Sequence, residues 1–195
     1  MYYFDWTATS PMGQEAINTY ILTAQNIIGN PSSTHPLGNT AAQTLEEARN
    51  TCASLLKVPR DTIYFTSGGT EGDSIVLQSL LNNPVPGEII VSAIEHSAIL
   101  ENKTILEKSG WKFTTLPCPN GYLEPQTLQK ALNPKVRMVS FMKVNNVTGT
   151  ILDTKALVKI VREYSKTIER PIHIHCDAVQ ALGKIDLNLK EEDFD

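Results

Sequence analysis

The amino-acid sequence predicts an α/β fold in which a mostly parallel sheet is covered by helices on both faces. Short apolar runs typical of strands alternate with segments of helical period along most of the chain, and the turns between them carry glycine-rich or polar motifs. A length of 195 residues with 41% hydrophobic residues is enough to bury a real core. We therefore expect one compact unit, residues 1–195.

The first part of the chain is expected to be mainly helical. Residues 1–10 suggest a short strand and a turn, and Ser10, which is followed by proline, is a favourable N-cap for a helix over residues 11–28. Two prolines and several small hydroxyl residues mark residues 29–36 as a loop. Apolar residues then recur at intervals of three and four, which predicts a second helix over residues 37–58.

Expected strands and helices alternate along the rest of the chain. The strands are predicted over residues 62–66, 88–93, 111–116, 136–144 and 171–176. The helices are predicted over residues 70–81, 97–108, 125–132 and 153–167. Right-handed crossovers between parallel strands place every strand-to-helix turn along one edge of the sheet, where open α/β folds bind their ligands. We expect the chemistry of the protein at that edge.

The composition argues against several kinds of partner. A net charge of -4 and a pI near 5.6 do not indicate the excess of basic residues that is typical of nucleic-acid-binding proteins. No apolar run reaches the length that a bilayer demands, and the amino terminus has no basic region of the signal-peptide type. Three cysteines at wide, irregular spacing favour a reducing compartment and predict no metal site. We expect a cytoplasmic protein that binds neither nucleic acid nor membrane.

A glycine-rich turn lies where one expected strand passes into a helix, at residues 65–73 (FTSGGTEGD). Adjacent glycines allow close approach of an anion, and the free N–H groups of a first helical turn suit a phosphate. Thr70 could add a hydroxyl donor beside Gly69. The alternative is an ordinary tight turn in which Ser67 or Thr70 caps the helix.

Two further turns carry side chains that could serve a ligand. His96 follows Glu95, and an imidazole can stack on a heteroaromatic ring or move a proton near neutral pH, although a capping role is more common. Asn145 and Asn146 could donate hydrogen bonds to a ring hydroxyl or a carboxylate, or could simply form a turn.

Asp177 ends the apolar run within residues 172–184 (IHIHCDAVQALGK), and Gln180 follows it. An aspartate at a strand end is usually a helix N-cap, but one held against a pyridine nitrogen keeps that nitrogen protonated and makes the ring an electron sink. A phosphate cradle, a stacking ring, an amide donor and a ring-nitrogen acid at one sheet edge together describe a pyridoxal phosphate site.

The motifs and their order resemble the amino-terminal half of class V aminotransferases, specifically the NifS/IscS-type cysteine desulfurases. The resemblance rests on FDWTATSP, NPSSTHPLG, FTSGGTEGD, IEHSAIL, VNNVTGT and HCDAVQALGK. It implies a partial aspartate-aminotransferase-like large domain (fold-type I), pyridoxal 5'-phosphate as cofactor and a homodimer. It also implies L-cysteine as substrate, L-alanine as product, and sulfur transfer to a protein cysteine as a persulfide. A sulfur-acceptor or scaffold protein of iron–sulfur cluster biogenesis would then be a partner.

The resemblance assigns roles to six positions: Gly69, Thr70, His96, Asn146, Asp177 and Gln180. Gly69 and Thr70 would hold the cofactor phosphate. His96 would stack on the ring and shuttle protons as the catalytic residue. Asp177 would pair with the pyridine nitrogen and Gln180 with the ring hydroxyl. Asn146 would contact the cofactor or the substrate.

The family's cofactor-binding lysine lies in a Ser-x-His-Lys motif beyond the DAxQ segment, and Lys184 is not that residue. We therefore expect a truncated chain that binds pyridoxal phosphate weakly or not at all and is inactive alone. Other class V enzymes, such as a selenocysteine lyase or an aminotransferase, share these motifs. A non-catalytic relic that serves as a scaffold, and an α/β domain for another phosphate ligand, are the remaining alternatives.

Overall fold

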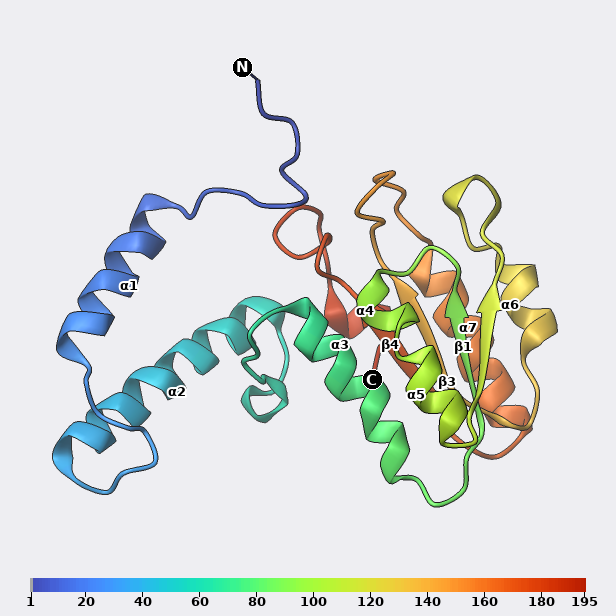
Figure 1. Cartoon of the computed structure of the whole chain (residues 1–195), viewed down its shortest axis with the longest axis horizontal. Helices are drawn as coiled ribbons and strands as arrows, with labels where there is room; N and C mark the ends of the chain where they lie inside the picture. Colours follow the sequence, from blue (N-terminus) through green and yellow to red (C-terminus); the bar gives the residue numbers. More distant parts are fainter. Residues whose placement is uncertain (1) are drawn as a thin grey trace. The chain divides into compact units, whose positions relative to one another are not determined.

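The computed structural model describes residues 2–195, which form two compact units that divide between Tyr64 and Phe65. The first unit consists of helices and loops, coloured blue to teal in Figure 1. Its elements are α1 (Gln14–Asn26), α2 (Pro36–Leu56) and the short 3₁₀ helix η1 (Arg60–Thr62). The mainly helical character predicted for this part of the chain is confirmed.

Helix α1 begins later than the sequence predicts. Gly13 occupies the N-cap position with an extended backbone (φ -60°, ψ 146°), so Ser10 is not the cap. Residues 2–10 contain a turn and no strand, which makes the strand expected there wrong. Helix α1 buries none of its residues, and without packing contacts nothing holds a further turn at its amino end.

Helix α2 is capped by a side chain. The Gly38 N–H donates to His35 Nδ1 across 3.2 Å, and Pro36 occupies the first helical turn, where its missing N–H costs nothing. The helix therefore begins one residue before the predicted start.

The strand predicted over residues 62–66 does not form. Pro59 leads into η1, and the Ile63 carbonyl accepts a hydrogen bond from the Arg49 guanidinium rather than from a neighbouring strand. Tyr64 and Phe65 are 81% and 51% exposed. Strand-type residues adopt a strand only when a partner supplies the ladder and covers one face, and none does so here.

Residues Phe65–Asp195 build the sheet. Every pair of neighbouring strands is parallel, in the order β2-β1-β3-β4. The strands are β1 (Glu88–Ser92), β2 (Lys112–Leu116), β3 (Val136–Met142) and β4 (His173–Asp177). This confirms the parallel sheet that the alternation of strand and helix patterns predicts.

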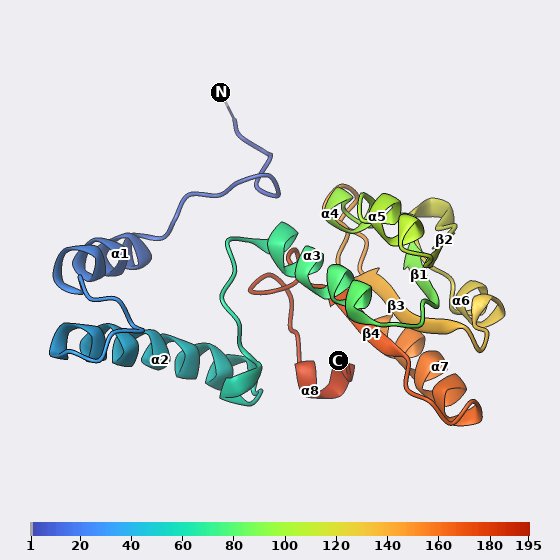
Figure 2. The ribbon, with the colours of Figure 1, turned by 60° about the horizontal axis from the view of Figure 1, so that its bottom comes forward.

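Helices cover both faces of the sheet, and Figure 2 shows α5 and α7 on opposite sides of it. One face packs against α3 (Gly69–Ser79), α4 (Ser97–Leu100) and α5 (Lys103–Lys108). The other packs against α6 (Pro125–Ala131) and α7 (Thr154–Thr167). Successive residues of a strand point to opposite faces, so Ile89 and Val91 join the first core while Ile90 joins the second. The short elements η2 (Leu80–Asn82), η3 (Pro119–Gly121) and α8 (Leu189–Glu192) complete the fold.

The helix predicted over residues 97–108 is divided in two. The side-chain amide of Asn102 donates to the Ala98 carbonyl across 2.7 Å, and the Asn102 N–H turns to the Ile99 carbonyl instead. A side chain that takes the carbonyl of residue i−4 competes with the helix ladder, so the helix ends and restarts at this point.

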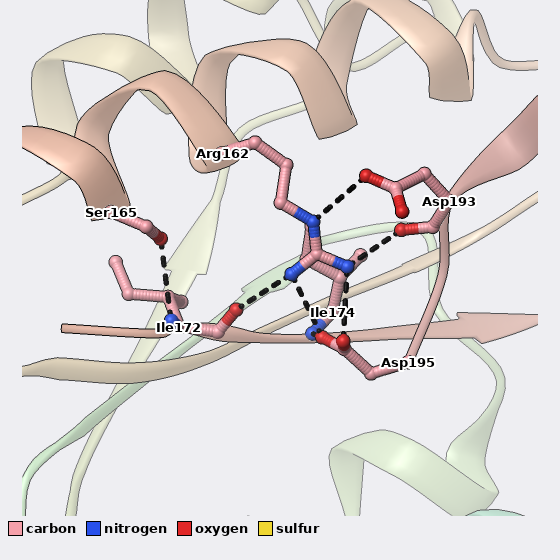
Figure 3. A network of polar contacts seen from close by, with 6 residues as sticks. All are labelled: Arg162, Ser165, Ile172, Ile174, Asp193 and Asp195. Carbon is pink, nitrogen blue, oxygen red and sulfur yellow. Dashed lines mark hydrogen bonds and ion pairs between the residues drawn. The ribbon is translucent and has the colours of Figure 1, made fainter.

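Arg162 of α7 ties the last residues to the outer edge of β4 (Figure 3). Its guanidinium contacts the Asp193 and Asp195 carboxylates, with Nε–Oδ2 3.1 Å and Nη2–Oδ1 3.0 Å respectively. The Ile174 N–H donates to Asp195 Oδ2 across 2.8 Å, and the Asp195 N–H donates to the Ile174 carbonyl across 3.1 Å. Backbone groups of an edge strand are thus paired instead of open to solvent.

Candidate functional site

The carboxyl ends of β1, β3 and β4 lie next to one another, because the strands are parallel. Val91 pairs in register with Ser140, and Met142 pairs with Asp177. The loops that carry His96 and Asn146 leave the sheet from this same edge. The prediction that these turns gather at one edge is therefore confirmed.

The turn into α3 presents a helix amino terminus without a side-chain cap. Gly68 holds the N-cap position, so the alternative in which Ser67 or Thr70 caps this helix is wrong. The Glu71 carboxylate accepts the Ser67 N–H, and this hydrogen bond lowers the pKa of Glu71. The N–H groups of the first helical turn have no partner within the helix, and the helix dipole favours an anion there. The turn has the features that a phosphate needs.

Gly69 lies against the turn that follows β4. A Cβ placed on Gly69 would lie 2.6 Å from Cγ2 of Val179, closer than any real contact of this kind. A larger residue at Gly69 would therefore force the Val179 side chain to shift. The contact brings the start of α3 next to the segment that carries Asp177.

His96 and Asn146 line one hollow of about 380 Å³ between the loops after β1 and β3. His96 Nδ1 accepts the Ala98 N–H across 3.1 Å, so the imidazole caps α4 while its side chain stays exposed. The capping role that the sequence suggested as an alternative is present, and it leaves the ring at the surface of the hollow.

Asn145 shapes the loop in which Asn146 lies. Its buried side-chain oxygen accepts the N–H groups of Val147 and Thr148 across 3.0 and 2.8 Å, and its amide donates to the Ile94 carbonyl across 3.0 Å. Asn145 thus forms the turn that the sequence suggested, and Asn146 next to it is the half-buried residue that faces the hollow.

Asp177 is a buried acid, 8% exposed, at the carboxyl end of β4. Its Oδ1 accepts the Val179 N–H across 2.9 Å, and turns rather than a helix follow, so Asp177 is not a helix N-cap. Burial raises the pKa of Asp177 above its ordinary value, and the charge of Asp73 adds to this effect. The Val179 hydrogen bond and the nearby His175 and His96 act in the opposite direction.

Gln180 lies in the same turn, three residues after Asp177. Its side-chain oxygen accepts a hydrogen bond from Lys184 Nζ. The six predicted residues thus fall into two neighbouring groups at one sheet edge. Gly69 meets the turn of Asp177 and Gln180, whereas His96 and Asn146 share a hollow.

The sequence placed Glu95 in the candidate turn beside His96 but did not predict that this acid is buried. Glu95 is 6% exposed, and its Oε1 accepts hydrogen bonds from the Ser92 hydroxyl and from the Met142 N–H, the latter across 2.8 Å. Burial raises the pKa of Glu95 to about 7. The signal that would have found it is an acid directly after a run of apolar strand residues, since such a position is covered.

Sequence reasoning also missed a buried pair behind Asp177. His175 Nε2 lies 3.4 Å from Asp73 Oδ1, with the two side chains 11% and 8% exposed. The alternation of β4 would have pointed to His175, since residues two apart in a strand share a face and Asp177 is two residues on.

Comparison with known proteins places the chain in a family. The model of the aminotransferase class V family matches residues 2–195. The chain belongs to this family. It is similar to a NifS/IcsS homologue of Lactobacillus delbrueckii subsp. bulgaricus, with 41% identity over 94% of this chain and 47% of the relative. It is 36% identical to the cysteine desulfurase IscS of Dictyoglomus turgidum, over 97% of this chain and 47% of the relative.

A solved NifS-like protein has the same fold, with a TM-score of 0.90 and 31% identity over 99% of this chain and 53% of that chain. The fold-type I architecture expected from the resemblance is confirmed. The chain spans about half the length of the curated relatives that it matches.

The family implies pyridoxal phosphate, and the residues of this chain fit it. A phosphate would find a helix amino terminus without a side-chain cap at α3, with a glycine at its first position packed against Val179. A pyridine nitrogen would find the buried carboxyl of Asp177 beside that terminus. Among residues 2–195, no group of three or more His, Cys, Asp or Glu side chains could hold a metal ion. Within the same range, no helix is both long and apolar enough to cross a membrane.

Proposed function

We propose that this chain is the cofactor-binding half of a pyridoxal-phosphate-dependent cysteine desulfurase, which removes sulfur from L-cysteine and leaves L-alanine. The observation that carries the proposal is the contact between Gly69 and Val179, because it sets the amino terminus of α3 beside the buried acid Asp177. The helix amino terminus suits the phosphate of the cofactor, and the acid suits its cationic ring nitrogen. The similarity to proteins named as cysteine desulfurases supports the substrate.

The phosphate would bind at the first turn of α3. The backbone N–H groups of Gly69 and Thr70 would donate to its oxygens, and the Thr70 hydroxyl, which is exposed, would add a third donor. The Glu71 carboxylate is turned back onto the Ser67 N–H, which keeps its charge on the outer side of this turn.

The ring nitrogen would meet Asp177. When bound, pyridoxal phosphate supplies an electron sink for the bonds of the substrate's α-carbon. The task of Asp177 is to accept a hydrogen bond from the protonated ring nitrogen, and low exposure strengthens a charge-assisted bond of this kind. The Val179 N–H holds the carboxyl in place by donating to Oδ1.

His96, Asn146 and Gln180 would complete the site. His96 Nδ1 is occupied by the Ala98 N–H, so Nε2 is the ring atom that would hold or pass a proton, while the flat ring faces the cofactor. Asn146 would donate its amide to the cofactor or the substrate from the other wall of the hollow. Gln180 would contact the ring hydroxyl.

The proposal extends to assembly and location. We expect a homodimer, cytoplasmic, that passes sulfur to an acceptor or scaffold protein of iron–sulfur cluster biogenesis. Helix α1 supports association, because it buries no residue and leaves Tyr20, Ile21 and Leu22 at 69%, 45% and 60% exposure. The chain alone would supply only non-covalent contacts, so we expect weak cofactor binding by itself and no turnover.

The binding part of the proposal is tested with 4-deoxypyridoxine 5'-phosphate, which has no aldehyde and cannot bond to a lysine. Titrated into the ¹⁵N-labelled chain, it should shift amide signals at Gly69, Thr70, His96 and Asp177. Asp177→Asn should weaken this binding, whereas the matched change Asp186→Asn at an exposed aspartate should not. Shifts spread over other residues, or none at millimolar probe, would refute cofactor binding at this edge.

The chemical part is tested on the intact protein that carries this sequence. Incubation with L-cysteine, pyridoxal phosphate and a thiol reductant should yield sulfide and alanine in equal amounts. His96→Gln should lower the turnover number more than the Michaelis constant, because it removes a group that acts on protons. Formation of a keto acid in place of alanine would point to an aminotransferase instead.

A further inference from the structure

One imidazole behind the candidate site contacts a buried carboxyl group and shares a strand face with a second one. His175 is on β4, two residues before Asp177, so both side chains point to the face that α3 covers. Its Nε2 lies 3.4 Å from Oδ1 of Asp73, which is on α3. Asp73 and Asp177 are 6% and 8% exposed. The region between α3 and the end of β4 thus contains two buried acids, and His175 contacts one of them.

The other ring nitrogen of His175 is also held. Nδ1 lies 2.9 Å from the hydroxyl of Ser140, the residue that pairs in register with His175 on β3. Ser140 is 1% exposed. Partners on both nitrogens, from two different elements, fix the orientation of the ring. Neither contact uses the atoms of Asp177, whose Oδ1 is bonded to the Val179 N–H.

We propose that His175 is a positioning residue for the ring-nitrogen contact: held by Ser140 and Asp73, it sets a basic ring on the same strand face as the Asp177 carboxyl. The inference rests on the proposed function only for the identity of the ring that Asp177 meets. Its core, the dependence of the charge of Asp177 on His175, is a property of the chain without any cofactor.

Neighbouring side chains change the pKa of Asp177 in opposite directions. Asp73 raises the pKa of Asp177, as two nearby negative charges oppose one another, and His175 lowers it by offering a positive charge. Other titratable side chains that interact with Asp177 are His96 and Glu95, just before α4, and Cys176 on β4. His96 lowers the pKa of Asp177, and Asp177 in turn raises that of Glu95. Without His175, the repulsion between Asp73 and Asp177 would be less compensated.

The link also joins the two halves of the candidate site mechanically. Asp73 is four residues after Gly69 in α3, and His175 is two residues before Asp177 in β4. A contact between Asp73 and His175 therefore fixes the first turn of α3, where the phosphate would bind, against the strand that carries the ring-nitrogen acid. Ser140 extends the same link to the central strand β3.

The test follows the Asp177 carboxyl by ¹³C NMR in the cofactor-free chain, with Asp177→Asn identifying its signal. In His175→Gln the carboxyl should titrate at higher pH than in the wild type. Asp73→Asn should move it to lower pH, and the double change should bring it back toward the wild-type value. His173→Gln, at an exposed histidine on the same strand and face, should leave the titration unchanged.

An unchanged Asp177 titration in His175→Gln overturns the inference. Should that variant fail to fold, as judged by amide signal dispersion, His175→Asn replaces it, because it removes the same imidazole and should shift the Asp177 titration in the same upward direction. Binding of 4-deoxypyridoxine 5'-phosphate is measured separately. His175→Gln should weaken it several-fold and should weaken inorganic phosphate binding less, because phosphate does not meet Asp177; equal loss for both would also contradict the inference. If the Asp177 titration shifts in His175→Gln but the wild-type chain binds no probe, the role of His175 is supported and the proposed function is refuted.

Discussion

Lys143 and Glu192 form an almost wholly buried ion pair, with Nζ and Oε1 2.9 Å apart and the side chains 10% and 5% exposed. The Thr154 hydroxyl bridges them, since it accepts from Lys143 Nζ and donates to Glu192. Because a buried charge that loses its partner cannot recover its hydration, Lys143→Met should lower the free energy of unfolding by about 3–5 kcal/mol. Urea unfolding measures this change.

A matched control lies on the neighbouring surface. Lys155 and Glu191 are 2.7 Å apart but 54% and 61% exposed, so Lys155→Gln should change the free energy of unfolding far less. The double variant Lys143→Met with Glu192→Leu should lose less stability than Lys143→Met alone, because it leaves no unpaired charge. Equal stability of Lys143→Met and the wild type would show that the pair is not buried in solution.

Glu95 should make the stability of the fold depend on pH. Burial raises the pKa of its carboxyl from 4.5 to about 7, so the folded state binds a proton more tightly than the unfolded state does. The stabilisation is fully present below pH 4.5 and is lost as the pH rises through about 7. Because a shift of one pKa unit corresponds to about 1.36 kcal/mol, ionisation of Glu95 should lower the free energy of unfolding by roughly 3 kcal/mol.

Glu95→Gln tests this directly, because an amide resembles the protonated acid in shape and cannot ionise. The variant should lose less stability than the wild type between pH 5 and 8 in urea unfolding, and should keep the contact with the Met142 N–H. Asp177, whose pKa burial also raises, contributes a change of the same sign in both proteins. Identical pH dependence of the two proteins would contradict the assignment.

The parallel sheet could be predicted from the sequence because its signal is local. Runs such as residues 88–93 and 136–144 are mostly apolar, and a strand covered on both faces favours that pattern. The run over residues 62–66 has the same composition and forms no strand, because a strand also needs a neighbour, and the sequence contains no local record of which run pairs with which.

The candidate site could be predicted where its residues belong to local motifs. Contacts between residues that are distant in the sequence could not be predicted. Asp177 ends a strand and Gly69 begins a helix, and the residues around each form a short motif that can be recognised in the sequence. The contact of Asp73 with His175 joins residues about a hundred positions apart, and it depends on how α3 lies on β4. The raised pKa of Glu95 depends on burial in the folded chain, where its carboxylate meets the Met142 N–H, 47 residues away. Neither is a property of a short stretch of sequence.

Arg162 should protect the edge of β4 from solvent exchange. Its guanidinium orients the Asp195 carboxylate that accepts the Ile174 N–H (Figure 3). Hydrogen bonds to charged groups are worth about 1.5–3 kcal/mol, so Arg162→Gln should speed exchange of the Ile174 amide by roughly tenfold or more. Native-state hydrogen exchange measures this rate. Lys155→Gln on the same helix should leave it unchanged, and unaltered Ile174 exchange in Arg162→Gln would disprove the role.

Substitutions at Gly69 and Val179 should have non-additive effects on the free energy of unfolding. Gly69→Ala places a methyl group 2.6 Å from Val179 Cγ2, and overpacking of this kind costs about 1–3 kcal/mol. Val179→Ala removes that Cγ2 atom, so Gly69→Ala should be nearly neutral in the Val179→Ala background. Gly72→Ala is the matched control in the same helix, because its nearest neighbour would be Thr66 Oγ1 at 3.9 Å. A double-mutant cycle of urea unfolding gives the coupling energy, and a value near zero would mean that the two segments do not meet.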